Sequence, residues 1–94
     1  MQIFAVYDKV SKTYGHLQAH PSSALAIREF TIATRNPQTM LHEFPDEYEL
    51  HLIGDFKEDD ENPITGKEPV ALITARAVQN MDSIEEKNQE LAAK

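Results

Sequence analysis

The sequence predicts an α+β domain, either a small antiparallel sheet or a curved partial barrel, with one helix packed on one face. The sequence contains one clear helix pattern, with two predicted strands before it and two after it, which gives the order β-β-α-β-β. A length of 94 residues leaves room for one domain and excludes enzymes with separate cofactor and substrate domains. Apolar residues at 40% and charged residues at 27% are typical of a globular chain. We assign residues 1–77 to this domain and residues 78–94 to a charged C-terminal tail or helix.

Residues 2–19 are predicted to form one antiparallel hairpin. The run from Gln2 to Asp8 is rich in β-branched and aromatic side chains and is short for a helix, which favours a strand. A loop of polar side chains follows, and residues 13–18 form the second strand. Gly15 lies inside this second strand and indicates a bulge or a close approach of the backbone.

Residues 24–35 carry the clearest helix pattern. Ser22 and Ser23 supply a cap ahead of it, and Asn36 followed by Pro37 ends it. An arc of about 120° on this helix holds the side chains expected to face the core. They are Ala26, Ile27, Phe30, Ala33 and Thr34. Leu25 and Ile32 lie on the opposite side, where they cap the edge of the core or meet a second subunit.

The second half of the domain is predicted to be another hairpin with a long tip. Residues 38–45 connect the helix to a strand over residues 48–56. Alternation places one set of its side chains on one face and another set on the other face. The first set is Tyr48, Leu50 and Leu52, and the second is Glu49, His51 and Ile53. An acidic loop over 57–67 leads to a last strand over 69–74.

The C-terminal segment from Val78 onward has charged residues and helix formers but few apolar anchors. Only Ile84 and Leu91 are large and apolar beyond residue 81. A helix with so few anchors is partly frayed or packs on a partner.

The charge of the chain is unevenly distributed. The net charge is −7, which by itself argues against a nucleic-acid partner. Residues 1–42 carry four cations and two anions, a net charge of +2, whereas residues 43–94 carry five cations and fourteen anions, a net charge of −9. The acidity therefore belongs to the second half, and a surface for nucleic acid has to lie mainly in the first.

Composition and motifs indicate neither an enzyme nor a metal protein. With no cysteine there is no disulfide, thiol nucleophile or cysteine zinc site. His16 and His20 have no carboxylate at ligand spacing, and the acidic loop does not follow the EF-hand pattern. Ser22 and Ser23 are best explained as helix caps, and there is no glycine-rich phosphate loop. We therefore expect no catalytic residues, no cofactor and no bound metal.

Cations interleaved with aromatic residues are the remaining pattern that carries chemistry. Proteins that bind single strands use cations along the phosphates and aromatic faces against the bases. The residues predicted to contact DNA are Lys9, Lys12, Tyr14, Arg28, Arg35 and Tyr48. Alternatives remain open, because tyrosines on strands often pack in the core and Arg28 is adjacent to Glu29, with which it can form a surface ion pair.

Several short motifs occur here in one order. They are Phe4-x-x-Tyr7-Asp8, Ala26-Ile27-Arg28-x-Phe30, Phe44-Pro45-x-x-Tyr48-x-Leu50 and Ile53-Gly54-x-Phe56, followed by an acidic turn that runs to Gly66. This ordered set, over roughly residues 3–75, resembles the small nonstructural protein family of gokushovirus-type microviruses, which are bacteriophages with single-stranded DNA genomes. The resemblance implies a phage protein that binds single-stranded DNA during genome replication or its handover to packaging, and it implies no catalytic residues.

Two functional hypotheses follow. The first is a non-enzymatic protein that binds single-stranded DNA and acts as a homodimer in the cytoplasm of the bacterial host, without a membrane-spanning segment. The second is a protein-interaction regulator that docks on the phage replication initiator, a host factor or the assembling capsid. The acidic second half of the chain and its C-terminal tail favour the second hypothesis.

Overall fold

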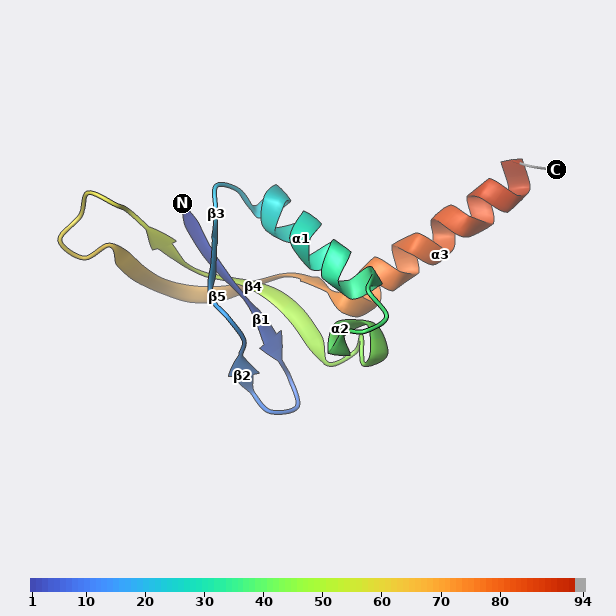
Figure 1. Ribbon diagram of the computed structural model, residues 1–94, viewed down its shortest axis with the longest axis horizontal. Coiled ribbons are helices and arrows are strands. Elements are labelled where there is room, and N and C mark those ends of the chain that lie inside the picture. Colours follow the sequence, from blue (N-terminus) through green and yellow to red (C-terminus); the bar gives the residue numbers. More distant parts are fainter. Residues whose placement is uncertain (93–94) are drawn as a thin grey trace.

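A computed structural model describes residues 1–92 of the chain and confirms the predicted α+β class (Figure 1). The elements are β1 (Gln2–Asp8), β2 (Thr13–Tyr14), β3 (Gln18–His20), α1 (Ser23–Arg35), α2 (Met40–Glu43), β4 (Tyr48–Phe56), β5 (Ile64–Thr74) and α3 (Ala75–Ala92). The five strands form one open antiparallel sheet in the order β2-β1-β4-β5, and β3 pairs with the same side of β1 as β2. The last two residues of the predicted tail lie outside the described residues.

Helix α1 lies across one face of the sheet and closes the core. Ser22 caps it by accepting a hydrogen bond from the backbone N–H of Leu25, at 3.3 Å, as the sequence predicts. Its buried residues, Ala26, Phe30 and Thr34, belong to the predicted arc. The core cluster joins this helix to the sheet and to the first turn of α3. It consists of Phe4, Ala26, Phe30, Leu50, Ala75 and Val78.

Strand register assigns the two faces of the sheet. Phe4 pairs with Leu52 and Val6 with Leu50, so these side chains point toward α1. This pairing confirms the predicted alternation of β4 as far as Leu52, because Ala5 on the opposite face pairs with His51. Ile53 interrupts it as an extra residue, since Ile3 pairs with Gly54 and Phe4 with Leu52. The face that carries Ala5 and His51 lies away from α1.

The second predicted strand, residues 13–18, is divided into two short strands. The register against β1 moves by one residue between Tyr14 and Gln18, and the backbone N–H of Gly15 donates to the carbonyl of Val6 at 2.9 Å in between. The extra residue is a bulge, which agrees with the position of Gly15. The predicted strand was too regular because alternation alone does not show where an extra residue interrupts the pairing.

The second hairpin and the C-terminal helix are both longer than predicted. Strand β5 begins at Ile64, so part of the predicted acidic loop belongs to the strand. Helix α3 follows β5 directly and begins at Ala75 rather than near residue 78. Val78 is only 1% exposed, which makes the first turn of α3 part of the core.

The molecule is elongated because two elements extend beyond the core. Its principal extents are 60 × 28 × 22 Å and its radius of gyration is 15.5 Å, against about 12 Å for a compact chain of this length. In Figure 1 the loop between β4 and β5 forms one end, and the C-terminal part of α3 forms the other. Within residues 1–92, no helix combines the length and apolar composition that a membrane crossing requires.

Candidate nucleic-acid interface

Three aromatic rings meet on the sheet face that points away from α1. Tyr7 of β1 stands opposite Tyr14 of β2, with ring centroids 5.0 Å apart. His51 of β4 stacks on Tyr7, with centroids 4.9 Å apart and an interplanar angle of 26°, and meets the edge of Tyr14 at 5.5 Å. We call Tyr7, Tyr14 and His51 the aromatic cluster.

The cluster combines one buried ring with two rings that solvent can reach. His51 is 8% exposed, Tyr7 is half-buried and Tyr14 is 39% exposed. The same face also carries an apolar hollow of about 150 Å³ around Ile3 and Ala19, which pair with each other. This side of the sheet thus presents aromatic and apolar side chains.

Hydrogen bonds fix the relative positions of the rings. The hydroxyl of Tyr14 lies 2.9 Å from Nδ1 of His51, and Nε2 of His51 lies 3.3 Å from Oε1 of Glu49. An ionised carboxylate only accepts, so in the neutral imidazole Nε2–H donates to Glu49 and Nδ1 accepts from the hydroxyl. Tyr14 comes from β2, whereas His51 and Glu49 come from β4. These two strands do not pair with each other, because β1 lies between them.

The hydroxyl of Tyr14 is protonated at neutral pH. Burial raises the pKa of Tyr14 above its usual value, and the charges of Tyr7 and Glu49 raise it further. Because the phenol keeps its proton, it can act as a hydrogen-bond donor in this network.

Two of the predicted cations lie next to the cluster. Lys9 and Lys12 occupy the turn between β1 and β2, and the pair Asp8–Thr13 separates them from the paired residues Tyr7 and Tyr14. Asp8 holds this turn by accepting a hydrogen bond from the backbone N–H of Val10 at 2.9 Å, and Lys12 has a left-handed φ of 59°. Neither lysine forms an ion pair with any of residues 1–92.

Of the other predicted contact residues, Arg28 and Arg35 lie on α1 and Tyr48 lies at the start of β4. Arg35 makes a bidentate ion pair with Asp82 of α3, at 3.0 and 2.8 Å, and its charge is therefore matched locally. Arg28 is exposed on α1 and forms no ion pair with a described residue, Glu29 included. Tyr48 packs against the core, and burial raises its pKa. The structure thus groups Lys9, Lys12 and Tyr14 at the β1–β2 hairpin, where Tyr48 lines a hollow of about 510 Å³ together with Tyr14, and it places Arg28 and Arg35 on α1.

Three residues of this site were absent from the predicted contact set. Tyr7, Glu49 and His51 complete the cluster and its hydrogen bonds. The sequence pattern of β4 already indicated that two of them, Glu49 and His51, share the face opposite Tyr48. Their proximity to Tyr14 depends on strand order, which local patterns do not show.

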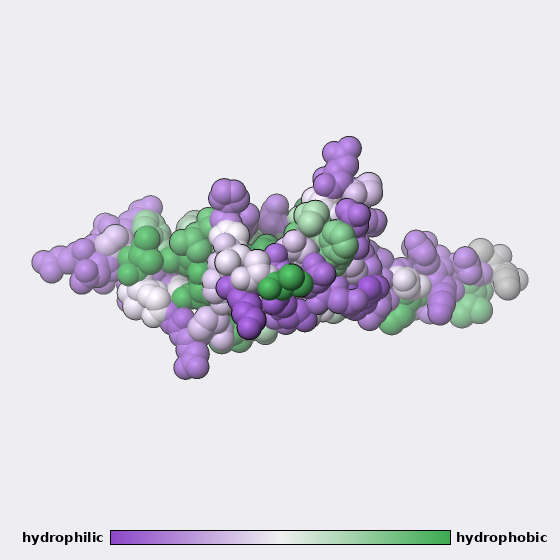
Figure 2. All heavy atoms as spheres, turned by 90° about the horizontal axis from the view of Figure 1, so that it is seen from below, coloured by the Kyte–Doolittle hydropathy of each residue, from purple (hydrophilic) through white to green (hydrophobic). Residues whose placement is uncertain are grey.

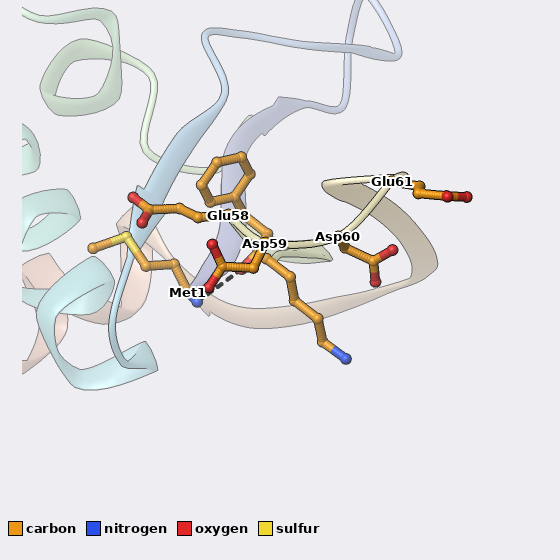
Figure 3. Close-up of a pocket in the computed structure, with 7 residues that line it drawn as sticks. Met1, Glu58, Asp59, Asp60 and Glu61 are labelled. Atoms are coloured by element: carbon orange, nitrogen blue, oxygen red, sulfur yellow. Dashed lines mark hydrogen bonds between the residues drawn. The ribbon is translucent and has the colours of Figure 1, made fainter.

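The acidic loop forms a separate open hollow of about 840 Å³ near the N-terminus (Figure 3). The ammonium of Met1 donates to the carbonyl of Phe56 at 3.0 Å. Figure 3 shows Asp60 and Glu61 pointing away from Met1, so the carboxylates of the loop do not converge. Among residues 1–92, no group of three or more metal-ligating side chains gathers at one point.

A family model described as phage ORF5 protein matches residues 1–78. The match includes the whole sheet, α1 and the first turn of α3, and it ends where α3 leaves the core. No curated protein and no solved structure matches the chain. Because the family model covers most of the sequence, the chain belongs to the phage ORF5 protein family and is a phage protein.

Proposed function

We propose that this phage protein binds single-stranded DNA, without catalysis, through the aromatic cluster and the two lysines of the β1–β2 turn. The observation that carries the proposal is a sheet face, not covered by α1, on which Tyr7 and Tyr14 present accessible rings beside Lys9 and Lys12. In the host cell, binding would serve genome replication or the handover of the genome to packaging.

Single-strand binding fits the chemistry of this face. Stacking on an aromatic ring contributes roughly 1–3 kcal/mol per base and tolerates any sequence, since every base has a π-face. Lys9 and Lys12 can contact phosphates because no described carboxylate pairs with them. A site with few phosphate contacts loses affinity steeply as salt concentration rises.

Most carboxylates of the chain lie away from this surface, although Asp8 of the turn, Asp46 near Lys9 and Glu49 beside His51 lie close to it. The loop from Glu58 to Glu61 is at the far end of the β4–β5 hairpin, whereas the β1–β2 turn projects from another edge of the molecule (Figure 1). Charges separated by more than about 8–10 Å in salt solution are largely screened from each other. The net charge of −7 therefore permits local attraction of phosphates.

Fluorescence anisotropy with a labelled oligonucleotide of about 20 nucleotides tests the proposal at low and moderate salt. We expect binding at 50 mM salt, a roughly tenfold loss of affinity for Tyr14→Ala and a smaller salt dependence for Lys9→Ala. Lys57→Ala removes the same charge at the start of the acidic loop, away from the cluster and from α3, and should leave affinity nearly unchanged. Absence of binding at 50 mM salt would contradict the proposal.

We further propose that the protein acts as a homodimer joined through α3. From Ser83 to Ala92 every side chain is exposed, and a helical segment of this length without contacts is marginal in water. Figure 2 shows hydrophobic side chains along one edge of this otherwise hydrophilic arm. The positions at alternating spacings of four and three residues are Ala77, Met81, Ile84, Asn88 and Leu91.

Such spacing is the heptad pattern of a coiled coil, and a polar Asn88 at one seam position favours a specific two-stranded register. Met81, Ile84 and Leu91 are 50–70% exposed in the single chain. A dimer would bring two aromatic clusters into one particle and increase its avidity for a strand. We expect sedimentation velocity to show a dimer. Ile84→Glu should dissociate it, while Ser83→Glu, which places the same charge on the outer face of the helix, should not.

The alternative function is docking on the replication initiator, a host factor or the capsid, and the exposed stripe of α3 is the observation that favours it. The family match ends at residue 78, so this arm is a feature of the present chain beyond the matched region. Co-purification from infected cells after nuclease treatment tests it. Partners that survive nuclease digestion and are lost in Ile84→Glu would support docking through α3.

A further inference from the structure

The hydrogen bonds from Tyr14 through His51 to Glu49 can exist in two arrangements that differ by one proton. We propose that protonation of His51 reverses the Tyr14–His51 hydrogen bond and strengthens DNA binding by the aromatic cluster. The effect on DNA rests on the proposed function, whereas the reversal itself is a property of the free protein.

In the neutral arrangement both ring nitrogens of His51 and the hydroxyl of Tyr14 have hydrogen-bond partners. Nε2–H of His51 donates to Glu49 at 3.3 Å, and Nδ1 accepts from the hydroxyl of Tyr14 at 2.9 Å. The hydroxyl proton of Tyr14 then points at the imidazole and is not available to a ligand.

In the protonated arrangement both ring nitrogens of His51 donate. Nδ1–H donates to the hydroxyl oxygen of Tyr14, so the hydroxyl proton must turn away from the imidazole. Tyr14 is 39% exposed, and the freed O–H can donate to a phosphate or to a base acceptor. No hydrogen bond within the network is lost, because the oxygen of Tyr14 changes from donor to acceptor.

The surroundings of His51 accommodate a positive charge. The carboxylate of Glu49 lies 3.3 Å away, and the face of Tyr7 is stacked against the imidazole at 4.9 Å. From β5 the neighbouring residues are Ala71, opposite His51, and Thr74, opposite Glu49, and neither titrates. Histidine is in general the side chain whose charge changes between about pH 5 and 8, so a test compares the two ends of this range.

The same proton changes the surface that DNA meets. A positive charge beneath two accessible rings attracts phosphates, and a new hydroxyl donor adds one contact. Together we expect about fivefold tighter binding at pH 5.5 than at pH 8.0.

The experiment measures the affinity of a single-stranded thymidine oligonucleotide, carrying a dye whose signal does not change with pH, at pH 5.5 and 8.0. The wild-type protein and His42→Gln should both show the increase, because His42 contacts the carbonyl of Thr34 in the α1 layer. His51→Gln should lose this increase. Tyr14→Phe keeps the charge of a protonated His51 but has no hydroxyl to turn, so it should show a smaller increase than the wild type. Tyr14→Phe keeps the ring and removes only the hydroxyl, so it tests the switch even where His51→Gln fails to fold.

Equal wild-type affinity at both pH values, or a pH effect of undiminished size in Tyr14→Phe, would overturn the proposal while leaving DNA binding intact. Absence of binding at either pH would instead contradict the proposed function. In that case NMR of the free protein tests the reversal of the Tyr14–His51 hydrogen bond separately. The ring signals of Tyr14 should change with pH together with those of His51. Tyr14 signals that stay constant would overturn the reversal.

Discussion

Gly54 of β4 faces the backbone of Thr65 in β5 so closely that a Cβ atom on Gly54 would lie 2.5 Å from the carbonyl oxygen of Thr65. Real Cβ atoms do not approach a backbone oxygen this closely, so only glycine fits without movement of a strand. The long β4–β5 hairpin, and with it the position of the acidic loop, depends on this contact.

Gly54→Ala should therefore destabilise the protein by roughly 1–3 kcal/mol, the usual effect of forcing extra atoms into a packed site. Gly66→Ala is the matched control, because an added Cβ there meets no atom within 4 Å. Urea unfolding followed by circular dichroism measures both. An equal loss of stability in the two variants would contradict the role of the Gly54–Thr65 contact.

Phe30 anchors α1 on the sheet, and it is 3% exposed. Phe30→Ala should lower the free energy of unfolding by about 3–5 kcal/mol, because it removes a buried ring and leaves a cavity. Ile32→Ala, on the same helix but at a residue that is 55% exposed, should change stability by less than about 0.5 kcal/mol. Thermal and urea denaturation of both variants test whether α1 packs through the predicted arc.

The fold could be predicted from the sequence where local patterns and burial agree. The cap at Ser22 and the arc through Phe30 locate α1, and alternation in β4 separates Tyr48 from His51. The bulge near Gly15 was also indicated by the sequence, but the division of the strand into β2 and β3 and the early start of α3 at Ala75 escaped prediction, because pairing with β1 and packing against the core determine them.

The candidate site could be predicted only in part. The sequence indicated Lys9, Lys12 and Tyr14, which the hairpin turn keeps together. It also indicated Arg35, whose partner Asp82 lies 47 residues away along the chain. Spatial pairing of that kind, like the meeting of Tyr14 with His51, is decided by topology rather than by local sequence.

Acid should weaken the attachment of α3 to α1. The hydrogen bond from Arg35 lowers the pKa of Asp82 below its usual value near 3.8. A carboxyl with a lowered folded-state pKa stabilises the protein above its unfolded-state pKa, and this stability is lost as pH falls through the folded-state value. We expect the melting temperature to fall below about pH 4 in the wild type and to fall less in Asp82→Asn, although the pair is exposed and its effect is modest.

Alkali should destabilise the protein through its tyrosines. Burial raises the pKa of both Tyr14 and Tyr48 above the usual value of 10.0. A raised folded-state pKa stabilises the protein below the unfolded-state pKa, and this stability is lost as pH rises through the folded-state value. Stability should thus decline above about pH 10, and Tyr14→Phe with Tyr48→Phe should lessen the decline. An identical decline in the double variant would show that other groups are responsible.

The central claim is that the aromatic cluster binds single-stranded DNA. NMR mapping of the ¹⁵N-labelled protein with a single-stranded oligonucleotide tests it most directly. Binding through the aromatic cluster predicts shifts in the amides of Tyr7, Lys12, Tyr14 and His51, and little change in α1 around Arg28. Shifts concentrated on α1, or spectra that the oligonucleotide leaves unchanged at low salt, would contradict it.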